Sequence, residues 1–114
     1  MTESRKDWLH GTLETLILRT VAAGPLHGYG IARSIETQSG ETIRVEEGSL
    51  YPALYRMQKR GWLEAEWGVS ELGRRAKFYR LTALGERQLR EDSAEWRRFV
   101  EGVARVLSPG EGAS

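Results

Sequence analysis

The chain has 114 residues, of which 39% are hydrophobic and 29% charged, and its net charge of +1 is that of an ordinary globular domain with a modest core. It contains no cysteine, which excludes a disulfide framework, a thiolate metal site and a cysteine nucleophile. No apolar run approaches ~20 residues and no signal-type apolar segment follows the N-terminus, so we expect a cytoplasmic protein that does not cross a membrane.

The first predicted helix begins with Asp7 as its N-cap and runs to about Ala23. Its buried stripe is marked by mostly apolar side chains at helical spacing, namely Leu9, Leu13, Leu16, Ile17, Thr20 and Val21. A second helix is expected from about Tyr29 to Gln38, with Ile31 facing the core. An extended linker then leads to a third helix.

The third predicted helix, from about Ser49 to Arg60, separates apolar from polar residues. Leu50, Leu54 and Met57 recur at i, i+4 and i+7 and should therefore be buried. Its opposite face carries two cations, a phenol and a hydroxyl but no acid: Ser49, Pro52, Tyr55, Arg56 and Lys59. Such a surface suits a polyanion, and a left-handed cap at Gly61 should end the helix.

Two short strands, Trp62 to Trp67 and Ala76 to Leu81, are predicted next, joined by a loop that contains Arg74 and Arg75. A helix followed by a hairpin with a basic tip is the second half of a winged helix-turn-helix. Residues 56–80 hold seven basic and three acidic groups, a net charge of +4, so positive charge gathers where a nucleic acid would bind. Charge alone fits a solvated basic face equally well.

A long final helix is expected from its cap at Thr82 to about Leu107. A helix of roughly 25 residues extends ~37 Å, which is longer than a small winged-helix core can cover. From Trp96 onward the apolar residues follow the spacing of a seam. We therefore expect a two-fold dimer with an interface formed by Trp8, Leu9, Trp96, Phe99, Val100 and Val103. The alternative is a helix that folds back on its own domain.

Five motifs, in order along nearly the whole chain, resemble those of the PadR-like transcriptional regulators. They are Gly11-Thr12-Leu13 with Leu16-Ile17-Leu18, His27-Gly28-Tyr29-Gly30-Ile31, Gly48-Ser49-Leu50-Tyr51-Pro52-Ala53-Leu54, Arg60-Gly61-Trp62-Leu63, and Arg74-Arg75-Ala76-Lys77-Phe78-Tyr79-Arg80-Leu81-Thr82. The chain is similar to the short subfamily, which has a single C-terminal dimerisation helix. The resemblance implies a mainly α fold with a small β-hairpin wing, and a repressor that binds a palindromic operator in double-stranded DNA as a homodimer.

The predicted organisation is a winged helix-turn-helix DNA-binding domain over residues 1–82, a dimerisation helix over 83–107 and a flexible tail over 108–114. Arg56 and Lys59 are candidates for contacts to base edges or flanking phosphates. Phosphate oxygens or thymine methyl groups suit the polar and aromatic residues Ser49, Tyr51, Pro52 and Tyr55, although Tyr51 fits the rim of the core equally well. On the wing, Arg74, Arg75 and Lys77 would neutralise phosphates or enter a minor groove.

Some PadR-like proteins bind flat aromatic compounds at the dimer interface, with a tryptophan at a comparable place on the final helix. On this resemblance, Trp96 is the candidate residue for a planar aromatic effector. The alternative is that Trp96 fills a closed dimer core.

Two other classes of function fit the sequence less well. An enzyme is not expected, because neither His10 nor His27 has the spacing to carboxylates of a metal site or general base, and Ser49 is better explained as a helix cap. No cofactor is predicted. The remaining alternative is a winged-helix protein-interaction module without DNA binding, against which the cations Arg56, Lys59, Arg74, Arg75 and Lys77 argue.

Overall fold

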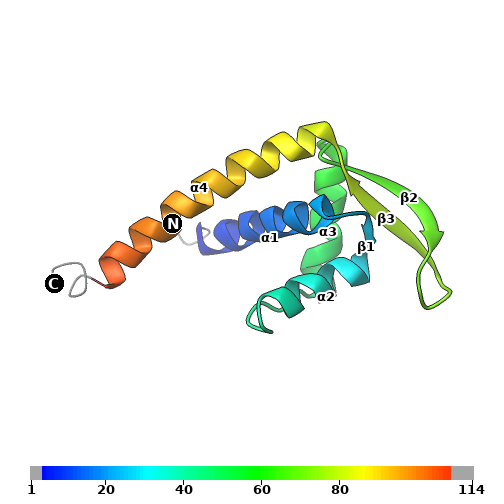
Figure 1. Cartoon of the computed structure of the whole chain (residues 1–114), viewed down its shortest axis with the longest axis horizontal. Helices are drawn as coiled ribbons and strands as arrows, with labels where there is room; N and C mark the ends of the chain where they lie inside the picture. Colours follow the sequence, from blue (N-terminus) through cyan, green and yellow to red (C-terminus); the bar gives the residue numbers. More distant parts are fainter. Residues whose placement is uncertain (1–3, 109–114) are drawn as a thin grey trace.

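A computed structural model describes the backbone of residues 4–108 and the side chains of residues 12–108. The elements in chain order are α1 (Ser4–Ala22), β1 (Leu26–His27), α2 (Gly28–Gln38), α3 (Glu47–Lys59), β2 (Leu63–Val69), β3 (Arg75–Leu81) and α4 (Ala83–Leu107) (Figure 1). The predicted fold class is confirmed: the described chain is mainly helical, with a small hairpin wing and a long C-terminal helix.

The three strands form one antiparallel sheet in the order β1-β3-β2. Strands β2 and β3 pair along their whole length, from Leu63↔Leu81 at the base to Val69↔Arg75 at the outer end. The short strand β1 adds Leu26 opposite Tyr79. The hairpin therefore stands on the helical core at its base and projects from it at its tip (Figure 1).

The core lies among α1, α2, α3 and the base of the hairpin. Leu50, Leu54 and Met57 are buried as predicted, because their spacing holds them on the one face of α3 that meets the other helices. Ile17 of α1 and Ile31 of α2 are fully buried against them. The sheet completes the core with Leu63 and Tyr79, whose side chains lie on the same face of paired strands.

The ends of the helices confirm some predictions and correct others. Gly61 has the predicted positive φ of 81°, and Thr82 caps α4 by accepting a hydrogen bond from the N–H of Gly85. The cap at Asp7 was wrong, since α1 begins at Ser4 and Asp7 lies inside it. Ser49 is not a cap either, because α3 begins at Glu47. Composition shows which residue types favour caps, but not which backbone N–H groups remain free.

The strand bounds also shift by a residue or two. Strand β2 begins at Leu63 rather than Trp62 and continues to Val69, and β3 begins at Arg75. The carbonyl oxygen of Trp62 is used instead by Thr82, whose backbone N–H and hydroxyl both donate to it. Trp62 thus links the end of α3 to the start of α4.

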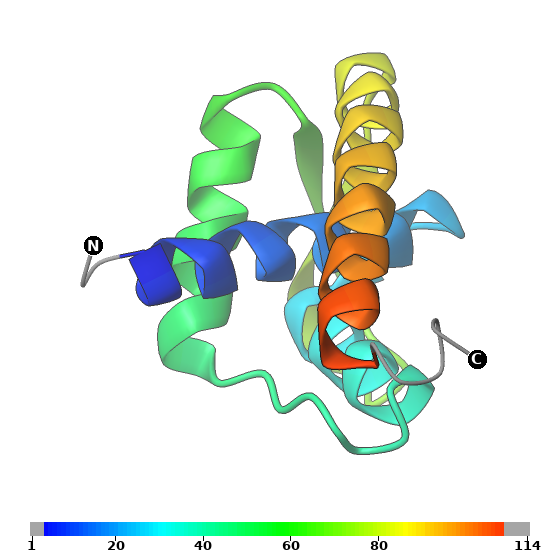
Figure 2. The same cartoon turned by 90° about the vertical axis from the view of Figure 1, so that its left-hand side faces the viewer.

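Helix α1 lies between α3 and α4. Figure 2 shows it crossing both, with α3 on one side and α4 on the other. Helix α4 runs along α1 in its first part and extends beyond it toward its C-terminal end (Figure 1).

Candidate nucleic-acid interface

The outward face of α3 is polar and aromatic. Pro52, Tyr55 and Lys59 recur along the line opposite the buried residues, and all three are exposed. The ammonium of Lys59 lies 5.5 Å from the centroid of the Tyr55 ring, a cation–π contact that leaves the ammonium accessible. Ser49 is exposed in the first turn of the same helix. This face therefore offers hydroxyls and a cation to solvent.

Tyr51 lies at the junction of α3 and α2. Its ring covers Gly28 so closely that a Cβ there would stand 2.8 Å from the phenol oxygen. It is 45% exposed, which makes it part of both the core rim and the surface. Buried Tyr79 lies near it, and burial first and then Tyr51 raise the pKa of the Tyr79 phenol. Tyr79 therefore stays protonated at neutral pH.

One face of the wing is cationic and aromatic. The pairs Trp67↔Lys77 and Val69↔Arg75 lie side by side on it, because directly opposed residues share a face of an antiparallel pair. The Arg75 guanidinium stacks 4.4 Å from the centroid of the exposed Trp67 ring. Stacking holds the guanidinium plane in place while its N–H edge stays free for an anion.

A groove of about 800 Å³ separates this face of the wing from the N-terminus of α2 and from α3. Its charged and aromatic lining includes His27, Tyr29, Tyr51, Arg74, Arg75 and Lys77. Three predicted wing residues and one predicted α3 residue thus line a single hollow. Its shape and charge suit an extended polyanion.

An acid at the wing tip also faces the groove. His27 accepts the N–H of Gly30 at Nδ1 (2.9 Å) and so caps α2. In the neutral ring the proton is therefore on Nε2, which lies 3.4 Å from Oε1 of Glu71. The Glu71 backbone N–H and then His27 hold the pKa of Glu71 below its ordinary value. No role for His27 or Glu71 followed from the sequence alone.

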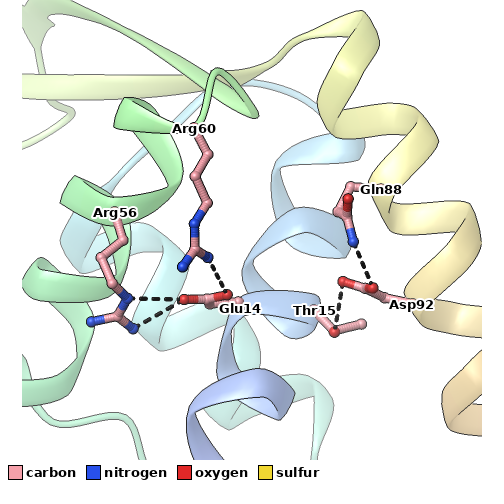
Figure 3. Close-up of polar contacts among 6 residues, drawn as sticks. All are labelled: Glu14, Thr15, Arg56, Arg60, Gln88 and Asp92. Atoms are coloured by element: carbon pink, nitrogen blue, oxygen red, sulfur yellow. Dashed lines mark hydrogen bonds and ion pairs between the residues drawn. The ribbon is translucent and has the colours of Figure 1, made fainter.

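Arg56, a predicted contact to base edges or flanking phosphates, is paired with an acid of α1. Its Nε and Nη2 lie 3.1 and 3.0 Å from Oε2 of Glu14 on α1, and Arg60 Nη1 lies 3.3 Å from the other carboxylate oxygen (Figure 3). The outward face of α3 has no acid of its own, as predicted, but α1 places the carboxylate of Glu14 at its edge. The sequence does not show this pair, whose members are 42 positions apart.

The second half of α4 presents an apolar stripe. Phe99, Val100 and Val103 are exposed by 47%, 43% and 38%, and the stripe continues to Val106 and Leu107. Trp96 is half-buried, with its ring centroid 5.6 Å from that of Phe99. The side chains of the two other predicted interface residues, Trp8 and Leu9, lie outside the described residues.

A cavity of about 460 Å³ lies between α1 and α4. Its wall includes the aromatic rings of Trp62, Trp96 and Phe99 and the carboxylates of Glu14 and Asp92. Asp92 accepts hydrogen bonds from Gln88 (2.9 Å) and from Thr15 of α1 (3.4 Å), which ties the two helices together (Figure 3). Trp96 was predicted to lie at the dimer interface. In the structure it also lines a cavity within a single chain.

Among the described side chains, those of residues 12–108, no group of three or more acidic or histidine residues is placed to hold a metal ion. None of the helices in this part of the chain is long and apolar enough to cross a membrane.

Comparisons with known proteins agree on one family. The model of the transcriptional regulator PadR-like family matches residues 17–91. The transcriptional regulator Rv3488 of Mycobacterium tuberculosis is 35% identical over 106 residues, which cover 93% of this chain and 92% of that protein. An uncharacterized protein X of Lysinibacillus sphaericus is 32% identical over 97 residues, covering 85% and 89%.

Solved structures are similar over nearly their full length. A PadR-like transcriptional regulator from Bacillus cereus superposes with a TM-score of 0.75 at 32% identity, covering 90% of this chain and 97% of that one. A transcriptional regulator from Clostridium thermocellum gives a TM-score of 0.77 at 27% identity, covering 87% and 96%.

Proposed function

The chain belongs to the PadR-like family of transcriptional regulators, and from this premise we propose that it is a repressor that binds a palindromic operator as a homodimer. The observation that carries the proposal is the groove between α3 and the wing, where Tyr51 meets Arg74, Arg75 and Lys77. Base edges would be read by the outward face of α3 in a major groove, and the wing would hold the flanking backbone.

The charge of the surface supports DNA over a protein partner. Of the seven cations in residues 56–80, three form ion pairs: Arg56 and Arg60 with Glu14, and Arg80 with Glu64. The remaining four, Lys59, Arg74, Arg75 and Lys77, form no ion pair in the described part of the chain. All four are on the outward face of α3 or on the wing. A protein-interaction module without DNA binding has no need of four cations concentrated there.

The homodimer is supported by the apolar stripe of α4. Phe99, Val100 and Val103 lie on this exposed apolar stripe in the second half of α4. A second copy that packs there by two-fold symmetry would bury them and present two recognition helices to inverted half-sites. In this arrangement residues 1–82 bind DNA and residues 83–107 form the dimer, whereas the predicted tail lies, from residue 109 on, outside the described residues.

We also propose that a small-molecule effector binds in the cavity between α1 and α4. Trp96, with Trp62 and Phe99, gives the α1/α4 cavity aromatic walls that suit a planar aromatic compound. A ligand there would change the position of α4, and with it the spacing of the two recognition helices. It would release DNA if it bound the two arrangements with different affinity. The alternative is that Trp96 binds no ligand and only fills a closed dimer interface.

Selection of bound duplexes from a random pool tests the proposed function. We expect enrichment of an inverted repeat whose half-site centres are about 34–36 Å apart, or a multiple of that distance. A variant with Arg74, Arg75 and Lys77 all changed to Ala should enrich nothing at the same salt concentration. If the wild-type protein enriches no sequence, or enriches a single half-site, the proposed operator binding is wrong.

A further inference from the structure

His27 presents one hydrogen-bond donor of fixed direction to the groove beside the wing. Its Nδ1 accepts the backbone N–H of Gly30 (2.9 Å), which leaves the proton of the neutral ring on Nε2. The ring packs on that of Phe78, with 5.2 Å between the two centroids. The side chain is only 8% exposed, yet it lines the groove. Two contacts therefore hold the ring, and Nε2–H is a donor that is already oriented.

In the free protein the acceptor for this donor is the carboxylate of Glu71, in the turn at the tip of the wing. Oε1 lies 3.4 Å from Nε2, which is long for this donor and acceptor. The Glu71 side chain is 82% exposed, so little else packs against it. Its own backbone N–H and, second, His27 lower the pKa of Glu71, which keeps the carboxylate charged at neutral pH. The donor is thus occupied by an anion that is only weakly held.

Glu71 is out of place in the charge pattern of the groove. It is the one acid among the described residues that line the groove, whereas Arg74, Arg75 and Lys77 line it with positive charge. A polyanion that the three cations attract would repel the Glu71 carboxylate. A phosphate of the DNA backbone offers an anionic oxygen of the same kind to a hydrogen-bond donor. It can therefore replace the carboxylate at Nε2.

We propose that Nε2–H of His27 binds a backbone phosphate of duplex DNA, and that the Glu71 carboxylate occupies this position until DNA displaces it. Glu71 can turn away at little cost, because it is exposed and its other contact is to its own backbone. The inference rests on the proposed function. It adds a phosphate contact at the edge of the groove opposite the wing cations, and a competitor for that contact within the chain.

His27→Asn removes the donor and keeps the cap. The side-chain oxygen of Asn can take the place of Nδ1, and Asn is among the most favourable N-caps, but its side chain does not reach the position of Nε2. We expect affinity for the operator and for random DNA to fall alike, by about tenfold per subunit, because a phosphate contact carries no sequence information. The slope of log K against log salt should not change, since a neutral donor releases no counterion.

Glu71→Gln removes the charge of the competitor and should raise affinity for DNA, by about threefold per subunit. The loss of any negative charge near DNA has some effect of this sign, so the same substitution is also made in His27→Asn. The increase should be clearly smaller there, because the site for which Glu71 competes is gone. Glu66→Gln removes an acid from the other face of the wing and is the matched control, with no increase expected.

NMR of the imidazole nitrogens tests the contact in the wild-type protein, without any change to the cap. On addition of duplex DNA, the Nε2–H signal of His27 should shift and exchange more slowly with water, while Nδ1 remains an acceptor. The chain has one other histidine, so a His10→Gln variant assigns the signals. If His27→Asn proves to be unfolded, this measurement decides alone.

Three results would overturn the inference. The first is a folded His27→Asn variant that binds DNA as tightly as wild type. The second is a Glu71→Gln substitution that raises affinity equally in both backgrounds, which would reduce Glu71 to a charge near DNA. The third is a set of His27 signals that bound DNA leaves unchanged. All three leave the proposed function intact, whereas a wild-type protein without operator binding would refute that function itself.

Discussion

Gly85, in the first turn of α4, lies directly against the carbonyl oxygen of Trp62. A Cβ at this glycine would overlap that oxygen and stand 2.8 Å from Cδ1 of Leu81. The same carbonyl accepts hydrogen bonds from the backbone N–H (3.1 Å) and hydroxyl (3.0 Å) of Thr82. The start of α4 is thereby fixed to the end of α3 and the base of the wing, which sets the direction in which α4 leaves the domain.

Gly85→Ala should therefore destabilise the protein, since the obstructing atom is backbone and cannot move aside as a side chain could. We expect a loss of about 1–3 kcal/mol or more in the free energy of unfolding. Gly48→Ala, in the first turn of α3 and with no atom within 4 Å of the new Cβ, should lose no stability. Urea denaturation at one subunit concentration measures both, and a Gly85→Ala variant as stable as wild type would contradict the close contact.

Glu36 should make stability depend on pH. Its carboxylate accepts hydrogen bonds from the Val45 backbone N–H (3.0 Å) and from Arg33 (2.9 Å). The Val45 N–H, with a smaller effect of Arg33, holds the pKa of Glu36 below its ordinary value of 4.5. Because the pKa is lower in the folded state, the contribution is complete above pH 4.5 and is lost as pH falls through the folded pKa.

The melting temperature of the wild-type protein should thus fall more steeply below pH 4.5 than that of Glu36→Gln. Thermal unfolding of the two proteins at a series of acidic pH values measures this difference. Hydrogen exchange at the Val45 amide should be faster in the variant at neutral pH. Parallel curves of melting temperature against pH would show that the pair contributes nothing to stability.

The sequence predicts contacts between residues close together in the chain better than contacts between distant residues. The burial of Leu50, Leu54 and Met57 follows from their spacing, because periodicity along one helix determines which side chains share a face. The ion pair of Glu14 with Arg56 does not, because it depends on how two distant helices cross. His27 as the cap of α2 was missed for another reason: a histidine is an uncommon N-cap, although its place just before Gly-Tyr-Gly marks a helix start.

Two arginines of the same strand should differ in DNA binding. Arg75 lies on the groove face of the wing, whereas Arg80 is paired with Glu64 on the opposite face. Arg75→Ala should weaken binding to all sequences alike and reduce the steepness of the salt dependence by about 0.9 per subunit. Arg80→Ala should leave that slope unchanged. Fluorescence anisotropy with one labelled duplex measures both, and equal effects would contradict the assigned groove face.

Val103→Glu should dissociate the proposed dimer, because it introduces a charge into the exposed apolar stripe of α4. Arg105→Glu changes the opposite side of the same helix and should leave the dimer intact. Sedimentation velocity distinguishes the two species. A Val103→Glu variant that remains a dimer would exclude this stripe as the interface.

Operator affinity of the wild-type protein, measured against salt concentration, tests the central claim most directly. Among the described residues, Lys59, Arg74, Arg75 and Lys77 form no ion pair. Each phosphate that they neutralise contributes roughly 0.9 to the slope of log K against log salt. A dimer that engages most of them should give a slope steeper than about −4. A slope near zero, or no binding at low salt, would contradict DNA recognition by this surface.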